Sequence, residues 1–264
     1  MKKEFRDQMG QDLSIEWPPK RIISLVPSQT ELLYWLGLNE EVVGITKFCV
    51  HPEEWYRTKL RVGGTKMLDF DKIAALKPDL IIGNKEENEE LQIKQLMQLY
   101  PVWMSDIHNL DDALGMMNGV GELVDKQEKA GELIKGVKEA FSKLLSAKLS
   151  QHKAAYFIWR DPYMVAGGDT FLSNMLSLCG LTNVFANNNG RYPKLTKEEI
   201  ALQNPEVILL SSEPYPFAAK HIDEFRQICP DAKIVLVDGE YFSWYGSRLL
   251  EAPAYFGKVL NEIQ

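Results

Sequence analysis

Two short segments concentrate the side chains that could bind a flat, partly charged ligand. Trp159-Arg160-Asp161-Pro162-Tyr163 combines a stacking ring, a fixed cation and a phenol. Arg160 could clamp a carboxylate or phosphate through two parallel hydrogen bonds, or it could simply pair with Asp161 in a surface loop. Residues 238–248 hold the second group, which is Tyr241, Phe242, Trp244, Tyr245 and Arg248. We expect two or three of these rings to face a ligand, since so many aromatics in one loop exceed what a core needs.

Further polar candidates follow the expected strands of the first half of the chain. Ligands of open α/β sheets bind beyond the carboxyl ends of the strands. Ser28 and Gln29 begin the first helix, where backbone N–H groups can bind an anion, although helix capping alone would explain them. Lys66 ends a Gly-Gly-Thr-Lys segment and could meet an acidic ligand, and Asn84 follows a later strand.

Enzymatic signatures are weak. Cys49 and His51 stand two residues apart after a strand, and Asp106 and His108 follow another, but two ligands do not make a metal site. The sequence has neither Gly-x-Ser-x-Gly nor Gly-x-Gly-x-x-Gly, so nucleophilic hydrolysis and dinucleotide chemistry have no visible support. We expect no enzymatic activity, no cofactor and no bound metal. A metal-dependent enzyme that uses these four residues is one alternative.

The composition limits the classes of protein to which the chain can belong. The 264 residues are 45% hydrophobic with a net charge of −7, which is ordinary for a globular protein and disfavours nucleic-acid binding. The three cysteines show no metal or disulfide spacing. Glu4, Arg6 and Asp7 stand where a signal peptide would be apolar, so the sequence as written predicts a cytoplasmic protein. A periplasmic or cell-surface location is expected instead if a signal was trimmed or mis-annotated.

The chain repeats one pattern in both halves. Ile73-Ala-Ala-Leu-Lys-Pro-Asp-Leu-Ile-Ile returns as Ile200-Ala-Leu-Gln-Asn-Pro-Glu-Val-Ile-Leu, in each case a helix end, a proline and a buried strand. Such a repeat favours two similar α/β lobes with parallel sheets. A hairpin is expected over residues 5–17. The apolar spacing predicts helices over 69–76, 86–99, 111–124, 126–149, 170–180 and 249–263, and strands over 80–82, 102–104, 154–159, 207–210 and 233–237.

These pieces together resemble a known family. Pro19-Lys-Arg-Ile-Ile-Ser-Leu-Val-Pro-Ser-Gln-Thr-Glu, Gly168-Asp-Thr-Phe-Leu-Ser-Asn-Met-Leu and the two repeat copies are similar to the helical-backbone metal receptors among ABC-importer substrate-binding proteins. The resemblance implies a class III periplasmic-binding-protein fold, with two Rossmann-like lobes bridged by one long helix. It predicts an N-terminal lobe at 1–125, a connecting helix at 126–149 and a C-terminal lobe at 150–264. The ligand would lie in the cleft between the lobes.

The resemblance also implies a ligand and a partner. The ligand would be a corrinoid or metal chelate, with cobalamin first and a ferric siderophore or haem next. Cobalamin receptors present tryptophans where this chain has Thr65 and Asn84, so Tyr192 and Tyr215 join the other aromatics as candidates. Glu90 and Glu198 would meet arginines of an ABC permease, although both could instead serve helix ends. We expect a monomer. A cytoplasmic binding or chaperone-like relative without a transport role is the other alternative.

Overall fold

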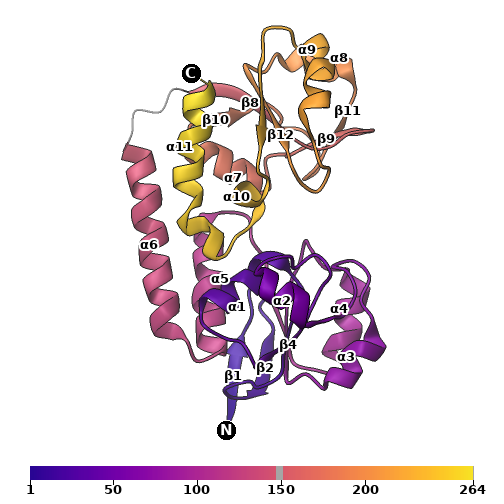
Figure 1. Ribbon diagram of the computed structural model, residues 1–264, viewed down its shortest axis with the longest axis vertical. Helices are drawn as coiled ribbons and strands as arrows, with labels where there is room; N and C mark the ends of the chain where they lie inside the picture. Colours follow the sequence, from indigo (N-terminus) through magenta and orange to yellow (C-terminus); the bar gives the residue numbers. More distant parts are fainter. Residues whose placement is uncertain (147–150, 264) are drawn as a thin grey trace. The chain divides into compact units, whose positions relative to one another are not determined.

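The protein folds into two compact units, each made of three separate stretches of chain. The computed structural model describes residues 1–146 and 151–263 (Figure 1). Unit 1 contains residues 1–107, 111–135 and 245–248, and unit 2 contains the described residues of 108–110, 136–244 and 249–264. The chain therefore leaves and re-enters each unit several times. The predicted α/β class is confirmed, whereas the domain boundaries predicted from the sequence stay a prediction.

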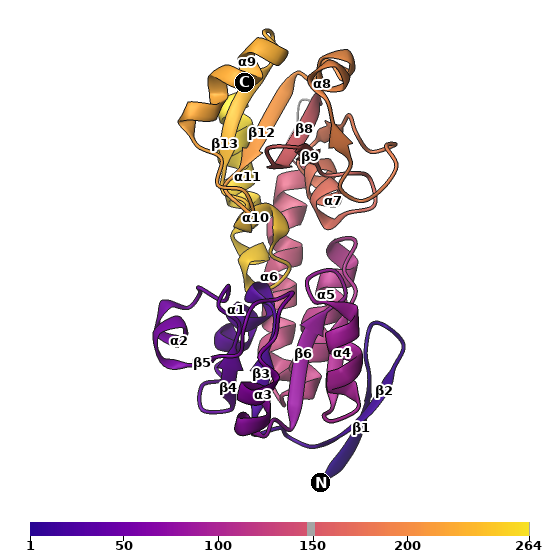
Figure 2. The same ribbon diagram turned by 90° about the vertical axis from the view of Figure 1, so that its right-hand side faces the viewer.

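Unit 1 is built on a five-stranded, all-parallel sheet (Figure 2). Its strands, in the order β5-β4-β3-β6-β7, are Leu60–Arg61, Val42–Ile45, Ile22–Ser24, Leu80–Asn84 and Val102–Ser105. Its helices are α1 (Pro27–Trp35), α2 (Glu53–Thr58), α3 (Phe70–Leu76), α4 (Glu90–Met97) and α5 (Leu110–Leu123). The strands β3, β6 and β7 are buried throughout, as parallel strands covered on both faces must be.

An N-terminal hairpin protects the free edge of this sheet. Strands β1 (Lys2–Arg6) and β2 (Asp12–Glu16) pair antiparallel, as predicted. The turn between them bonds to edge strand β7, because Gln8 N donates to Met104 O (3.1 Å) and Met104 N donates to Asp7 Oδ2 (3.3 Å). Burial raises the pKa of Asp7, although the hydrogen bonds that its carboxylate accepts from backbone N–H groups, including that of Met104, act in the opposite direction. The backbone N–H and C=O groups of Met104, on the edge strand β7, thereby have hydrogen-bond partners within the chain.

Unit 2 contains a six-stranded sheet with four parallel strands and two antiparallel ones. Strands β8 (His152–Trp159), β12 (Val207–Ser211), β13 (Lys233–Val237) and β10 (Leu181–Asn183) are parallel to one another. Strand β9 (Tyr163–Val165) runs antiparallel to β8, and β11 (Lys194–Leu195) runs antiparallel to β9. The turn at Asp161-Pro162 sends the chain straight back along β8, so no crossover helix intervenes.

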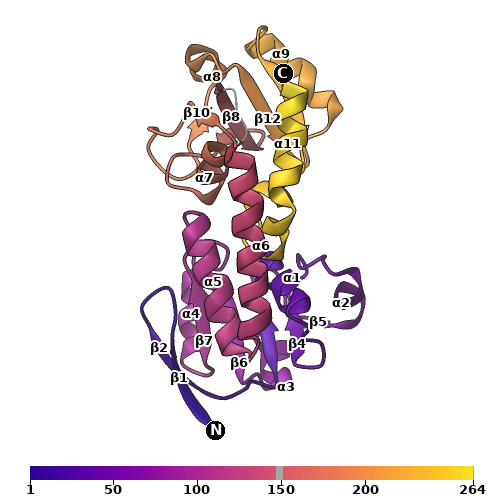
Figure 3. The same ribbon diagram turned by 90° about the vertical axis from the view of Figure 1, so that its left-hand side faces the viewer.

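Helices cover the sheet of unit 2 and include a long helix that both units share. Helix α6 spans Gln127–Ser146, and the predicted end at Leu149 lies outside the described residues. Residues 136–146 of α6 pack on α11, with the rings of Phe141 and Phe256 6.4 Å apart (Figure 3). The other helical segments are α7 (Phe171–Leu178), α8 (Lys197–Gln203), η1 (Ala219–His221), α9 (Ile222–Ile228), α10 (Glu240–Ser243), η2 (Ser247–Leu250) and α11 (Ala252–Ile263). No described helix is both long and apolar enough to span a bilayer.

The sequence repeat is a structural repeat. Helices α3 and α8 each end in a residue of left-handed conformation, Lys77 (φ 46°) and Asn204 (φ 44°), directly before a proline. The acid that opens the next strand then accepts hydrogen bonds from the neighbouring strand. Asp79 accepts from Arg21 N (2.8 Å), and Glu206 accepts from Lys153 N (2.7 Å). The same residue types therefore make the same junction in both units.

Local differences from the predicted elements have physical reasons. Neither Ser28 nor Thr30 caps α1, because Val26 is the N-cap and Pro27 occupies the first turn. The Thr30 hydroxyl instead donates to Val26 O (2.9 Å), which ties it to the preceding strand. Helix α4 begins at Glu90 rather than Glu86, since the side chain of Asn84 holds residues 86 and 87 in a turn and Glu89 caps the helix.

Candidate functional site

An exposed tryptophan on a buried aromatic stack is the clearest binding feature of unit 2. Trp159 ends β8 and has 40% of its surface exposed. Its ring meets Tyr215 edge to face at 5.7 Å, and Tyr215 in turn packs on buried Phe217 at 4.8 Å. Tyr215 follows β12, so both residues stand beyond the carboxyl ends of neighbouring parallel strands. The core thus supports a platform formed by Trp159 and Tyr215, and the exposed surface of Trp159 remains open to a ligand.

A carboxylate of α9 organises the polar part of this platform. Arg160 Nε donates to Glu224 Oε2 (2.7 Å), and the Tyr163 hydroxyl donates to Glu224 Oε1. Arg160 therefore pairs with Glu224 and not with Asp161, the partner considered from the sequence. Burial would raise the pKa of Glu224, but the bonds from Tyr163 and Arg160 lower it. Burial and the Glu224 carboxylate raise the pKa of Tyr163. The carboxylate stays ionised and holds the cation beside Trp159.

Most aromatic residues of the segment 238–248 belong to the core. Phe242 has no exposed surface and packs between Tyr156 (5.2 Å) and Phe256 (4.5 Å). Trp244 and Tyr245 are each 6% exposed. Tyr241 is half-buried and stacks on Tyr255 at 4.4 Å. Tyr241 and Phe242 thus pack on α11, and the prediction that two or three rings of this segment face a ligand stays a prediction.

Arg248 pairs with Glu31, a carboxylate on α1. Its Nη2 lies 2.5 Å from Glu31 Oε1, and Ser247 Oγ lies 3.3 Å from Glu31 Oε2. The side chains of Arg248 and Glu31 are only 14% and 19% exposed. A Cβ on Gly246 would come within 2.6 Å of Ser28 O, so this segment also lies directly against the first turn of α1. The pair fixes residues 245–248 on unit 1.

Removing one member of this pair should destabilise the protein. We expect Arg248→Ala to lower the free energy of unfolding by about 2 kcal/mol, because Glu31 would keep a largely buried charge without its partner. Glu31→Ala should cost a similar amount, and the double variant should cost clearly less than the sum. Urea unfolding of all four proteins measures this coupling. Additive effects would show that the two side chains do not stabilise one another.

Glu213 is a buried acid beside this segment. Its Oε1 lies 2.6 Å from Ser243 Oγ and accepts from Trp244 Nε1 at 3.1 Å. Burial raises the pKa of Glu213, and the charges of Glu240 and Asp238 add to the effect. The native carboxyl group therefore keeps its proton to a higher pH than it does in the unfolded chain.

A glutamine at position 213 should change the pH dependence of stability. The native state binds this proton more tightly, so the stability of the wild type falls as pH rises from the unfolded pKa of about 4.3 through the raised native value. Glu213→Gln keeps the acceptor oxygen and removes this loss. We expect the variant to gain stability relative to the wild type between pH 5 and pH 7.5, as measured by urea unfolding at both pH values. A constant difference between the two proteins would contradict the buried-acid assignment.

The predicted ligand residues of unit 1 are mostly held inside the unit. Gln29, Thr65 and Asn84 are 0%, 8% and 2% exposed. Gln29 Nε2 donates to Ser105 Oγ (2.7 Å), which also accepts from Asn84 Nδ2 (2.9 Å). The Oγ of Ser28 and the Oε1 of Gln29 are buried and have no hydrogen-bond partner among the described residues. Such atoms leave unused bonding capacity at the start of α1.

Lys66 and Tyr192 take different positions. The Lys66 ammonium donates to the carbonyl oxygens of Glu86 and Asn88, so it closes a loop of unit 1. Tyr192 is half-buried in the loop before β11, next to Arg191. Arg191 Nη1 lies 3.4 Å from Asp169 Oδ2, and Asp169 Oδ1 lies 2.8 Å from His108 Nδ1. The hydrogen bond from His108 lowers the pKa of Asp169, with a smaller contribution from Arg191.

The residues considered for a metal enzyme each have other partners. Cys49 is fully buried, with Thr30 Oγ1 and Thr46 Oγ1 each 3.1 Å from its sulfur, and burial raises its pKa. Asp106 pairs with Lys85 (2.6 Å), and His108 pairs with Asp169. Within residues 1–146 and 151–263, no three His, Cys, Asp or Glu side chains gather as metal ligands would.

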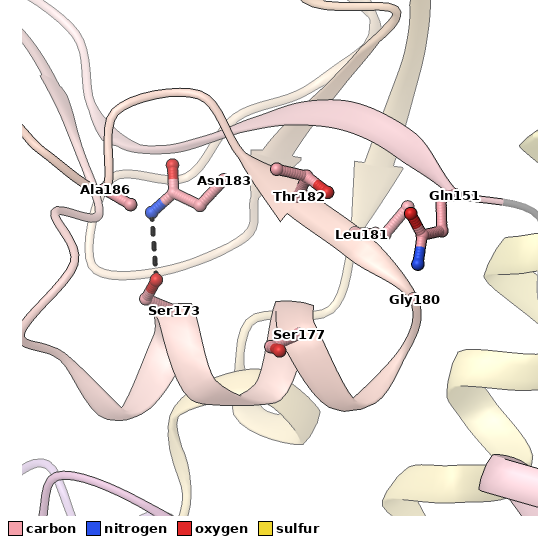
Figure 4. A pocket seen from close by; sticks show the side chains of 8 residues that line it. All are labelled: Gln151, Ser173, Ser177, Gly180, Leu181, Thr182, Asn183 and Ala186. Carbon is pink, nitrogen blue, oxygen red and sulfur yellow. Dashed lines mark hydrogen bonds between the residues drawn. The ribbon is translucent and has the colours of Figure 1, made fainter.

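A cavity of about 280 Å³ lies between α7 and β10 in unit 2 (Figure 4). Its lining is Gln151, Ser173, Ser177, Gly180, Leu181, Thr182, Asn183 and Ala186, and none of these is a predicted ligand residue. The Asn183 amide donates to Ser173 Oγ (3.1 Å) and to Ala166 O (2.9 Å), while its oxygen accepts from Phe185 N (3.0 Å). The polar groups of Asn183 thus serve the fold of unit 2.

The acidic residues considered for docking are exposed at helix starts. Glu198 is the second residue of α8, and its own backbone N–H and the Thr196 side chain lower its pKa. Glu90 opens α4 and pairs with Lys94 (2.5 Å). The structural repeat aligns Ile73 with Ile200, so the equivalent of Glu198 in unit 1 is exposed Asp71, the second residue of α3.

Three residues of these groups were not among the site residues predicted from the sequence: Glu31, Asp71 and Glu224. Glu31 and Glu224 meet partners 217 and 64 positions away, which no local pattern indicates. Asp71 could have been found, because extending the repeat two residues upstream pairs it with Glu198.

Comparison with known proteins gives the family. The model of the family described as periplasmic binding protein matches residues 22–227. A vitamin B12-binding protein of Pectobacterium carotovorum is 26% identical over 89% of this chain and 86% of its own length. The ABC transporter substrate-binding lipoprotein YvrC of Bacillus subtilis, itself uncharacterized, is 28% identical over 93% of this chain and 81% of its own length.

Solved structures agree on the fold. The periplasmic vitamin B12 binding protein BtuF of Vibrio cholerae superposes with a TM-score of 0.81 at 23% identity, covering 94% of this chain and 98% of the other. At that identity the likeness extends to the fold and not to the ligand. Since the family model covers both repeat copies and the strands that carry Trp159 and Tyr215, the chain belongs to the periplasmic binding protein family.

Proposed function

We propose that this protein is the substrate-binding protein of an ABC importer and that it binds a corrinoid or another metal chelate, such as haem or a ferric siderophore. It binds its ligand without converting it. The names of the relatives from Pectobacterium and Bacillus support this reading.

The observation that carries the proposal is the platform of Trp159, Arg160 and Tyr215 on unit 2. A planar macrocycle could stack on the exposed indole, and its polar rim could meet the guanidinium and the phenol. Tyr163 and Tyr192 lie on the neighbouring strand and loop and complete the proposed set in this unit. In unit 1, Ser28 and Gln29 at the first turn of α1 remain proposed ligand residues.

The proposed partner is a basic surface of an ABC permease. Exposed carboxylates at equivalent places of two equivalent helices, Asp71 and Glu198, could orient the protein on such a surface and speed the encounter. Glu90, which the sequence predicted for this role, lies one helix away and is engaged by Lys94. Delivery to an importer would place the protein outside the cytoplasmic membrane.

A ligand-dependent rise in melting temperature tests the proposed function. A ligand that binds only the native state at 100 times its dissociation constant stabilises that state by about 2.7 kcal/mol. We expect one of cyanocobalamin, haemin or ferric ferrichrome to raise the melting temperature by several degrees, while the other two act weakly. No shift with any of the three would contradict the proposal.

A further inference from the structure

The tautomer of a buried histidine determines the chemistry of the platform. His221 is 5% exposed and packs against the rings of Tyr215 and Phe217, each 5.5 Å away. The backbone N–H of Ala218 donates to His221 Nδ1 at 2.9 Å, so Nδ1 carries the lone pair. A neutral imidazole then has its proton on Nε2, which lies 3.2 Å from the Tyr215 hydroxyl. His221 therefore donates to the oxygen of Tyr215.

The hydrogen of His221 Nε2 occupies a lone pair of the Tyr215 oxygen, so the hydrogen of the Tyr215 hydroxyl itself remains to be donated. In the part of the chain that the structure describes, no acceptor receives that hydrogen. It is left for solvent or a ligand beside the exposed ring of Trp159.

We infer that His221 makes Tyr215 a dedicated hydrogen-bond donor, so that the platform selects planar ligands that carry an acceptor, a carboxylate or an amide carbonyl, at their rim. This inference rests on the proposed function. His221 acts as a positioning residue, because it fixes the direction of the Tyr215 hydroxyl without contacting the ligand. The Arg160 guanidinium, held by Glu224, adds a positive charge that favours the same class of ligand.

Matched porphyrins provide the binding test. Haemin carries two carboxylates at its rim, whereas iron(III) etioporphyrin has the same ring with alkyl groups only. We expect Tyr215→Phe to weaken haemin binding about tenfold, as for the loss of a hydrogen bond to a charged group, and to leave etioporphyrin binding within twofold. His221→Phe should lower the same selectivity, and His221→Gln, which can still donate, should restore it. Tyr34→Phe, which removes an exposed hydroxyl on α1 of unit 1, is the control.

Nitrogen-15 NMR of the free protein tests the tautomer without any ligand. We expect His221 to be protonated at Nε2 and unprotonated at Nδ1, with its signals identified by their loss in His221→Phe. A proton on Nδ1, or equal loss of both porphyrins in Tyr215→Phe, would overturn the inference. If the wild type bound neither porphyrin but bound cyanocobalamin, the amides at the rim of cyanocobalamin would take the place of the carboxylates. We would then expect Tyr215→Phe to weaken cyanocobalamin binding and Tyr34→Phe to leave it unchanged. If the wild type bound none of cyanocobalamin, haemin and ferric ferrichrome, the proposed function would be contradicted, and the tautomer of His221 would still decide whether Tyr215 is held as a donor.

Discussion

Replacing Trp159 with alanine should weaken ligand binding by about 1–3 kcal/mol, which is roughly a 5- to 150-fold rise in the dissociation constant. The indole is 40% exposed in the free protein and already held by Tyr215, so a ligand that covers it gains buried area without ordering a mobile side chain. Titration of the variant with the ligand identified by thermal shift measures the loss.

Two further variants separate stacking from general apolar burial. Trp159→Phe keeps a ring and should retain most of the affinity. Leu202→Ala removes an exposed apolar side chain that is 81% accessible on α8, and it should leave binding unchanged. Wild-type affinity in Trp159→Ala would remove Trp159 from the site. An equal loss in Leu202→Ala would point to an indirect effect on unit 2.

Reversing the charges at Asp71 and Glu198 should lower affinity for the permease at least 100-fold. Each lysine would place like charges opposite the proposed arginines, which costs several kcal/mol when both positions are changed. Ligand binding should remain within twofold, because neither residue belongs to the platform of Trp159, Arg160 and Tyr215. Binding to the cognate permease reconstituted in lipid nanodiscs measures the effect, and higher salt should reduce it.

Charge reversal at a helix start also weakens the helix, so the comparison needs a matched control. Glu128→Lys makes the same change in the first turn of α6 and should leave docking intact. Glu90→Lys tests the residue that the sequence predicted. A loss in Glu90→Lys without one in Asp71→Lys would favour α4 as the docking element of unit 1. Unchanged docking in Asp71→Lys and Glu198→Lys together would refute the docking proposal.

The fold followed from the sequence where local rules act. The repeat around Ile73 and Ile200 predicted equivalent junctions, and the αL residues Lys77 and Asn204 before their prolines confirm them. The hairpin and the shared helix α6 also came from pattern alone. Strands β9 and β11 were missed, because segments of three and two residues carry too little periodicity to be recognised.

The candidate site was only partly predictable, because residue type does not say which way a ring faces. Trp159 and Phe242 were equally good stacking candidates by type, yet one is exposed and the other fills the core between Tyr156 and Phe256. Arg160 was recognised as a cation, but its orientation depends on Glu224, 64 positions away. Contacts of this range arise from tertiary packing, which no window of sequence records.

The most direct test of the account is a calorimetric titration of the purified protein with cyanocobalamin, haemin and ferric ferrichrome, followed in parallel by tryptophan quenching. We expect saturable one-to-one binding of one of these chelates below micromolar concentration, with quenching that is clearly smaller in Trp159→Phe than in the wild type. Absence of saturable binding for all three, or binding with quenching unaltered in that variant, would contradict the assignment of the platform as the ligand site.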